Sequence, residues 1–85
     1  MELTTHQTEL LFQVAEKHLE WYKLYYKDPP KFEVLLELNH TKLSYMIDED
    51  TTEKDITDAL NNIYKQYETM VEDYGKGYTS NFYGE

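Results

Sequence analysis

The sequence contains no cysteine and no arginine, and its 85 residues include only three glycines and two prolines. The absence of cysteine excludes disulfides, thiolate chemistry and zinc–sulfur sites. Without arginine, the chain lacks the side chain that makes bidentate contacts to phosphate and guanine. No apolar run approaches the roughly 18 residues of a membrane-spanning helix, and no secretory signal is visible at the N-terminus. We therefore expect a cytoplasmic protein.

Negative charge dominates the composition, because the 17 aspartates and glutamates outnumber the eight lysines and give a net charge of −9. Binding to nucleic acid or to an anionic membrane needs clustered cations, so we expect neither as a direct partner. An acidic surface instead favours another protein, of basic character, through electrostatic steering and complementarity. The alternative is that the charge serves solubility alone.

The length and the apolar content indicate one small folded domain. Apolar residues make up 40% of the chain and aromatic residues 15%, too much for a fully disordered protein. The length is well below that of two domains. We expect residues 1–75 to form the domain and residues 76–85, which include two glycines, to be a flexible tail or an added edge strand.

Residues 4–27 are predicted to form a helix. Thr4 or Thr5 is a suitable N-cap, and the Asp28-Pro29-Pro30 sequence ends the helix because a residue before proline avoids the α region. On a helical wheel its apolar, aromatic and histidine side chains span about 240°, wider than one-sided burial requires. This width indicates a second partner, either another copy of the chain or another protein. Tyrosines with solvated hydroxyls are the alternative explanation. Tryptophan and tyrosine are enriched at interfaces, which makes four residues candidates for a dimer or partner contact: Trp21, Tyr22, Tyr25 and Tyr26.

Residues 31–38 and 42–48 are predicted to form a β-hairpin with a turn at Asn39-His40. Apolar residues alternate with polar ones in both segments, as in a half-buried strand. The turn would pair Leu36 with Leu43 on the apolar face and Glu37 with Lys42 on the other face. Asn-His is a weaker turn signal than Asn-Gly.

Residues 53–74 are predicted to form a second helix. Thr52 is the expected N-cap, with Asp55 in the capping-box position and Gly75 just after the last turn. Apolar residues recur at alternating spacings of four and three: Ile56, Leu60, Ile63, Tyr67, Met70 and Tyr74. The predicted fold is therefore α+β, a helix, a β-hairpin and a helix, with both helices packed on one face of a two-stranded antiparallel sheet.

Side chains with catalytic potential do not form a recognisable motif. The histidines His6, His18 and His40 lack metal-binding spacing, and we expect His18 to be a packed, hydrogen-bonded residue of the first helix. Neither Ser44 nor Ser80 lies in a nucleophile elbow. We expect no enzymatic activity.

The acidic run from Asp48 to Asp50 also fails as a calcium loop. Such a loop needs glycine at position 53 and glutamate at position 59, where the chain has Glu53 and Ala59. Acidic residues near a helix N-terminus are explained by the helix dipole. We expect no metal ion and no cofactor.

The acidic residues could instead imitate a phosphate backbone. Carboxylates four residues apart on a helix, such as Glu68 and Glu72, lie about 6 Å apart, which is close to phosphate spacing. The candidate contact residues are Asp48, Glu49, Asp50, Asp55, Asp58, Glu68 and Glu72. The alternative is a solvated face, since lysines interrupt the rows.

The leading functional prediction is a small acidic regulator or inhibitor that binds and masks a basic, nucleic-acid-binding protein. The abundance of Lys, Asn, Ile and Tyr, whose codons are AT-rich, suggests a low-GC bacterial genome or one of its phages or mobile elements. The alternative is a homodimeric structural or assembly accessory without an inhibitory role. In both cases the partner is a protein.

Overall fold

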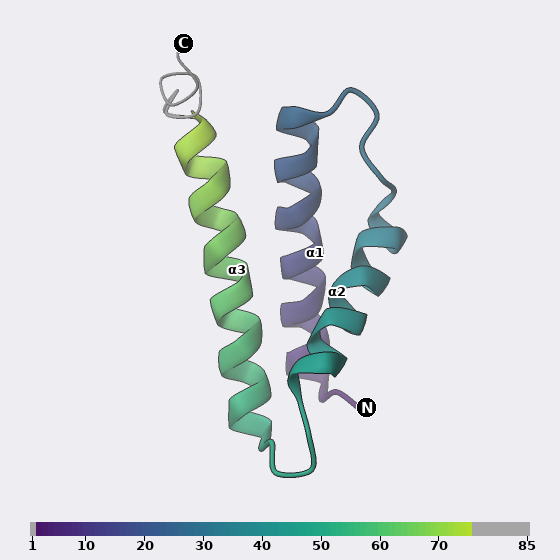
Figure 1. The fold of residues 1–85 in the computed structure, drawn as a ribbon, viewed down its shortest axis with the longest axis vertical. Coiled ribbons are helices and arrows are strands. Elements are labelled where there is room, and N and C mark those ends of the chain that lie inside the picture. Colours follow the sequence, from purple (N-terminus) through teal and green to yellow (C-terminus); the bar gives the residue numbers. More distant parts are fainter. Residues whose placement is uncertain (1, 76–85) are drawn as a thin grey trace.

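The structure, a computed structural model, describes residues 2–75 as three helices. They are α1 (Thr5–Tyr25), α2 (Phe32–Met46) and α3 (Glu53–Gly75). In Figure 1, α1 and α3 run in the same direction and α2 runs in the opposite one. Helix α1 packs extensively against both of the others, whereas the contact between α2 and α3 is much smaller. The result is an all-α arrangement in which the first helix is central.

The predicted α+β fold is wrong, because the segment expected to form the β-hairpin is helix α2 and residues 2–75 contain no strand. The buried residues of α2 are Leu35, Asn39 and Leu43, spaced four apart as on one face of a helix. Val34 and Leu38, which belong to the apparent alternation, are instead about half exposed, at 54% and 50%. The apparent alternation of apolar and polar residues therefore arose from a helix that carries apolar side chains on two faces.

Helix α1 begins with a complete capping box. The Thr4 hydroxyl accepts a hydrogen bond from the Gln7 backbone N–H at 3.1 Å, and the Gln7 side-chain oxygen accepts one from the Thr4 N–H at 3.0 Å. The Gln7 amide nitrogen also donates to the Glu53 carbonyl at 3.0 Å, which ties the starts of α1 and α3 together. The helix predicted over residues 4–27 is confirmed, with ends one or two residues further in.

Helix α3 also begins with the capping interaction expected from the sequence. The Thr52 hydroxyl accepts from the Asp55 N–H at 3.1 Å, and the Asp55 carboxylate accepts from the Thr52 N–H at 3.2 Å. The helix predicted over residues 53–74 is confirmed, except that Gly75 is its last residue instead of following it. The predicted tail, residues 76–85, lies outside the described residues.

The core forms where α1 meets its two neighbours. All three helices contribute to it, and its buried members are Leu11, Val14, Leu43, Ile56, Leu60 and Ile63. Burying each such side chain contributes roughly 1.5–3 kcal/mol. The wide apolar arc of α1 is now explained within the chain, because α3 covers one side and α2 covers another (Figure 1). The segment that we had expected to pack on this helix as a hairpin does so as α2, and the expected contact with a second copy or another protein stays a prediction.

Crossing a membrane requires a helix of sufficient length and apolarity. None of α1, α2 and α3, which make up the helical part of residues 2–75, meets both conditions. Many of the apolar residues of these helices lie in the core or in the groove described below, and others are exposed on the outer face of α2.

Candidate binding surface

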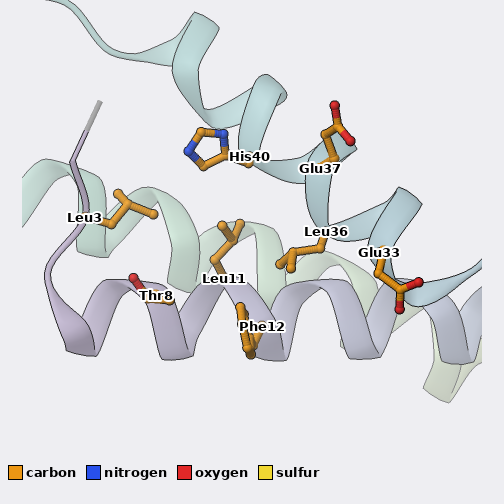
Figure 2. A pocket seen from close by; sticks show the side chains of 8 residues that line it. All are labelled: Leu3, Thr8, Leu11, Phe12, Glu33, Leu36, Glu37 and His40. Atoms are coloured by element: carbon orange, nitrogen blue, oxygen red, sulfur yellow. The ribbon is translucent and has the colours of Figure 1, made fainter.

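A hollow of about 380 Å³ lies between α1 and α2. Its size falls in the range of protein sites that take a ligand or a few partner side chains. We call it the α1–α2 groove and define it by its lining residues: Leu3, Thr8, Leu11, Phe12, Glu33, Leu36, Glu37 and His40. Figure 2 shows Leu11 of α1 and Leu36 of α2 directed toward each other, with Leu3 beside them. These three leucines form an apolar floor.

The groove is positioned by the packing of α2 on the N-terminal half of α1. Leu11 belongs to the core, being 4% exposed, so the floor is fixed by the same contacts that hold the fold. Beside the groove, the rings of Phe12 and Phe32 pack edge to face, with centroids 6.0 Å apart and planes at 85°. Such a T-shaped pair is a favourable aromatic arrangement. Phe12 still exposes 45% of its surface and so remains available to a ligand.

Two carboxylates border the groove along α2. Glu33 and Glu37 are one helical turn apart and exposed, and neither forms an ion pair with any of the described residues. Glu33 lies in the first turn of α2, where the helix dipole favours a negative charge. In Figure 2 the Glu37 carboxylate points away from the leucine floor. The groove thus combines an apolar floor with an acidic border, which suits a ligand that is both apolar and cationic.

The four aromatic residues named from the sequence are brought together at the end of α1. Trp21 lies 5.1 Å from Tyr22 and 4.8 Å from Tyr25, measured between ring centroids, and Tyr22 lies 5.2 Å from Tyr26. Trp21 and Tyr22 are half-buried, while Tyr25 and Tyr26 are 40% and 52% exposed. The cluster continues inward, because the Tyr22 ring is 4.9 Å from that of His18. Part of this surface is therefore used to extend the core.

A buried polar cluster joins the three helices through one residue from each. The Asn39 amide nitrogen of α2 lies 3.1 Å from His18 Nδ1 of α1, and the Tyr67 hydroxyl of α3 donates to Asn39 Oδ1 at 3.4 Å. The His18 and Tyr67 rings stack with centroids 4.3 Å apart. Asn39 also donates to the Leu35 carbonyl at 2.8 Å, so both of its amide hydrogens are used. His18 is the packed, hydrogen-bonded residue expected, whereas Asn39 had been assigned to a turn.

The pKa values in this cluster follow from burial. Burial lowers the pKa of His18, and the positive charge of Lys42 lowers it further. Burial raises the pKa of Tyr67, with a smaller contribution from Tyr22. A neutral His18 leaves Nδ1 free to accept from the Asn39 amide, which places the proton on Nε2. Among the described residues no fully buried side-chain nitrogen or oxygen lacks a hydrogen-bond partner, so we interpret the cluster as structural.

The first group of predicted acidic contact residues lies around the α2–α3 loop. Asp48 Oδ1 accepts from the Asp50 N–H at 2.9 Å and from the Thr51 hydroxyl at 3.1 Å, and so shapes the loop. Asp55 caps α3, as described above, and Asp58 pairs with Lys54 at 2.8 Å. Glu49 is exposed in the same loop. Several of these carboxylates therefore have local structural roles.

The second group, Glu68 and Glu72, lies much further along α3. At 1.5 Å per residue, Glu72 is about 25 Å from Asp55 along the helix axis. Glu68 is half-buried and Glu72 is exposed. The structure therefore does not gather the seven predicted acidic residues into one compact patch.

The remaining candidates for chemistry are not assembled into a site in the described part of the chain. The Ser44 hydroxyl donates to the His40 carbonyl one turn earlier in α2, at 3.0 Å. Ser80 lies outside the described residues. Within residues 2–75, no group of three histidine, aspartate or glutamate side chains is placed to hold a metal ion.

No family model, no curated protein and no solved structure matches this chain. The functional argument therefore depends on the geometry of the molecule itself. In the described part of the chain, the α1–α2 groove combines a hollow, an apolar floor and two carboxylates that form no ion pair there.

Proposed function

We propose that the protein is a small, non-enzymatic binding protein that holds an apolar, basic segment of a partner protein in the α1–α2 groove. The observation that carries the proposal is the leucine floor bordered by the exposed carboxylates of Glu33 and Glu37, which form no ion pair within residues 2–75. The net charge of −9 supports it, because a strongly acidic molecule attracts a basic segment over a longer range.

The segment best suited to this groove is an amphipathic helix. A groove between two helices accepts the apolar side of a third, with anchors spaced one turn apart. In such a complex, leucine-like anchors would contact Leu11 and Leu36, and a lysine or arginine beside them would reach Glu33. Apolar contact would supply most of the affinity, while the carboxylates would set the orientation and the association rate.

This proposal keeps the basic partner expected from the sequence and moves the main contact from α3 to the groove. The acidic residues of the α2–α3 loop and of α3 then contribute a long-range field. An inhibitory role follows if the bound segment is the one with which the partner contacts nucleic acid, since the segment cannot occupy both sites at once.

A synthetic amphipathic peptide with leucines and lysines at helical spacing provides the test. Its affinity is measured by calorimetry at low and near-molar salt, for the full chain and for three variants. Glu33→Lys and Phe12→Ser alter the groove, and Glu72→Lys changes the net charge as Glu33→Lys does but lies on α3.

We expect Glu33→Lys and Phe12→Ser each to weaken the peptide's affinity by about tenfold, a loss of roughly 1.4 kcal/mol. Glu72→Lys should lower it only slightly, because a distant exposed charge is largely screened at physiological salt. Equal losses for Glu33→Lys and Glu72→Lys would mean that only the net charge attracts the peptide. No binding at low salt would contradict the proposal altogether.

A further inference from the structure

Helix α2 carries a second apolar face, directed away from the rest of the molecule. It consists of three large apolar residues and one threonine at spacings of four, three and four, which we call the α2 stripe: Val34, Leu38, Thr41 and Tyr45. The exposed fractions of Val34, Leu38 and Tyr45 are 54%, 50% and 87%. Large apolar side chains exposed at this spacing are typical of a helix that packs on another helix.

The fold gives the stripe no partner among the described residues. Helix α2 packs on α1 through Leu35, Asn39 and Leu43, which are all less than 2% exposed. On a helical wheel, the centre of the stripe lies roughly opposite Asn39 and Leu43. No other element of residues 2–75 lies over the stripe, and we therefore consider a second molecule as its partner.

The charges beside the stripe indicate what covers it. In the heptad nomenclature of coiled coils, Leu38 and Tyr45 occupy position "a", and Val34 and Thr41 occupy position "d". Glu37 then occupies position "g" and Lys42 position "e", the two positions that flank the contact. In a parallel pair of helices, a g residue faces the e residue five positions further along the partner. Glu37 of one copy would therefore face Lys42 of the other, and symmetry would produce this pair twice.

We propose that the α2 stripe pairs in parallel with the α2 stripe of a second copy of this chain. The contact is isologous, because each stripe residue meets its own counterpart across a two-fold axis along α2. An antiparallel pairing would bury the same apolar side chains. It would, however, place Glu37 against the side of the partner helix that carries Ser44, and Lys42 against the side of Leu35. Only the parallel arrangement matches opposite charges.

Forming the pair requires a small rearrangement of Lys42. Its ammonium group lies 6.0 Å from the centroid of the Tyr67 ring. An exposed cation–π contact of this kind is weak, and lysine has a long, flexible stem, so the ammonium group can turn toward a carboxylate of the second copy.

Four stripe residues are far fewer than the roughly 20–30 per side of a standard interface. The dimer should therefore be weak and depend on concentration.

The first test is a charge exchange in the full chain, followed by sedimentation equilibrium over a wide concentration range. Glu37→Lys and Lys42→Glu each place like charges at both contacts and should weaken self-association by about tenfold. The double variant, Glu37→Lys with Lys42→Glu, restores opposite charges and should recover it. Circular dichroism checks that each variant stays helical. Failure of the double variant to recover would overturn the parallel register.

The second test uses the absence of cysteine from the natural sequence. Single variants Val34→Cys, Thr41→Cys and Tyr45→Cys are each exposed to a mild oxidant. In the parallel register all three positions meet their counterparts, so all three should form cross-linked dimers. In an antiparallel pair only a position near the middle of the stripe would do so. Asn62→Cys on the exposed side of α3 is the control and should remain monomeric.

This inference is independent of the proposed groove function, although Glu37 borders both surfaces. Leu38→Ser removes an apolar anchor of the stripe and leaves the groove lining unchanged. It should abolish self-association while peptide binding persists. Glu33→Lys should have the opposite effect. A wild-type chain that stays monomeric at millimolar concentration would overturn the dimer without affecting the groove.

Discussion

Helices α2 and α3 differ in how they distribute apolar side chains. In α3 these residues form one stripe, whose members Ile56, Leu60 and Ile63 are buried. In α2 they occupy two faces, one buried around Leu43 and one exposed around Leu38. A helix with one apolar stripe is satisfied by one neighbour, whereas a helix that is apolar on two sides has surface left over after folding. Of the three described helices, α2 therefore keeps the most large apolar side chains exposed after folding.

Helix α1 completes this comparison, because it too has a wide apolar surface but lies in the middle. Helix α3 covers one of its sides and α2 another. The surplus apolar surface of α1 is thus largely used in folding, and that of α2 is not. A broad apolar arc in a sequence predicts two neighbours, but it does not say whether the second belongs to the same chain.

The largest expected effect tests the two faces of α2 with the same substitution. Leu35→Ala removes a side chain that is 1% exposed and should lower the free energy of unfolding by about 2–5 kcal/mol. Leu38→Ala, three residues on at 50% exposure, should change it by less than about 0.5 kcal/mol. Urea denaturation at low protein concentration measures both. Similar losses for the two variants would show that α2 does not have distinct inner and outer faces.

The next effect concerns the polar residue on the inner face of α2. Asn39→Ala leaves His18 Nδ1 and the Tyr67 hydroxyl without their buried partner. Each unsatisfied group costs about 1–3 kcal/mol, so we expect a total loss of roughly 2–6 kcal/mol for the two groups. Asn62→Ala on the exposed face of α3 is the matched control and should be close to neutral. If the two variants unfolded at the same urea concentration, the cluster would have no role in joining the helices.

The sequence identifies α1 and α3 because their local signals agree with their environment. Thr52 and Asp55 form the predicted capping box, and the spacing of Leu60 and Ile63 matches a single buried stripe. The sequence misidentifies α2 because apolar residues on two faces of a helix also produce an apparent alternation. The spacing of Leu35, Asn39 and Leu43 is the helical signal that was present there.

The α1–α2 groove was not predictable once α2 was assigned to strands. Its floor combines Leu3 and Leu11 with Leu36, which is distant in sequence and joins them only through packing of α2 on α1. The buried cluster was partly predictable. His18 was expected to be packed, but Asn39 is polar and was assigned to the turn, and nothing in the sequence paired either residue with Tyr67. Local patterns thus anticipated the helix ends better than the contacts between helices.

A smaller effect tests the N-terminal cap of α3. Thr52→Ala removes the hydroxyl that accepts from the Asp55 N–H, and should cost about 1 kcal/mol. Thr69→Ala, at an exposed position inside the same helix, should be neutral or slightly stabilising because alanine is the better helix former. Thermal denaturation followed by circular dichroism compares the two. Equal melting temperatures would mean that the cap contributes nothing to α3.

The smallest expected effect is a pH dependence of the free energy of unfolding that arises at the buried face of α2. Burial and the nearby Lys42 lower the pKa of His18 from its usual value of 6.5, so below about pH 6.5 the unfolded chain takes up a proton that the folded chain does not. Stability should therefore fall as pH decreases through the window between 6.5 and the lowered value. A proton on Nδ1 would in addition face the Asn39 amide nitrogen, which is also a donor. Urea denaturation at several pH values above about 5, where carboxylates remain mostly ionised, measures it. The slope should be lost in His18→Gln and retained in His6→Gln, which changes an exposed histidine at the start of α1. A slope that persists in His18→Gln would show that another group titrates. Protonation of His18 would then not affect how strongly α1, α2 and α3 are held together.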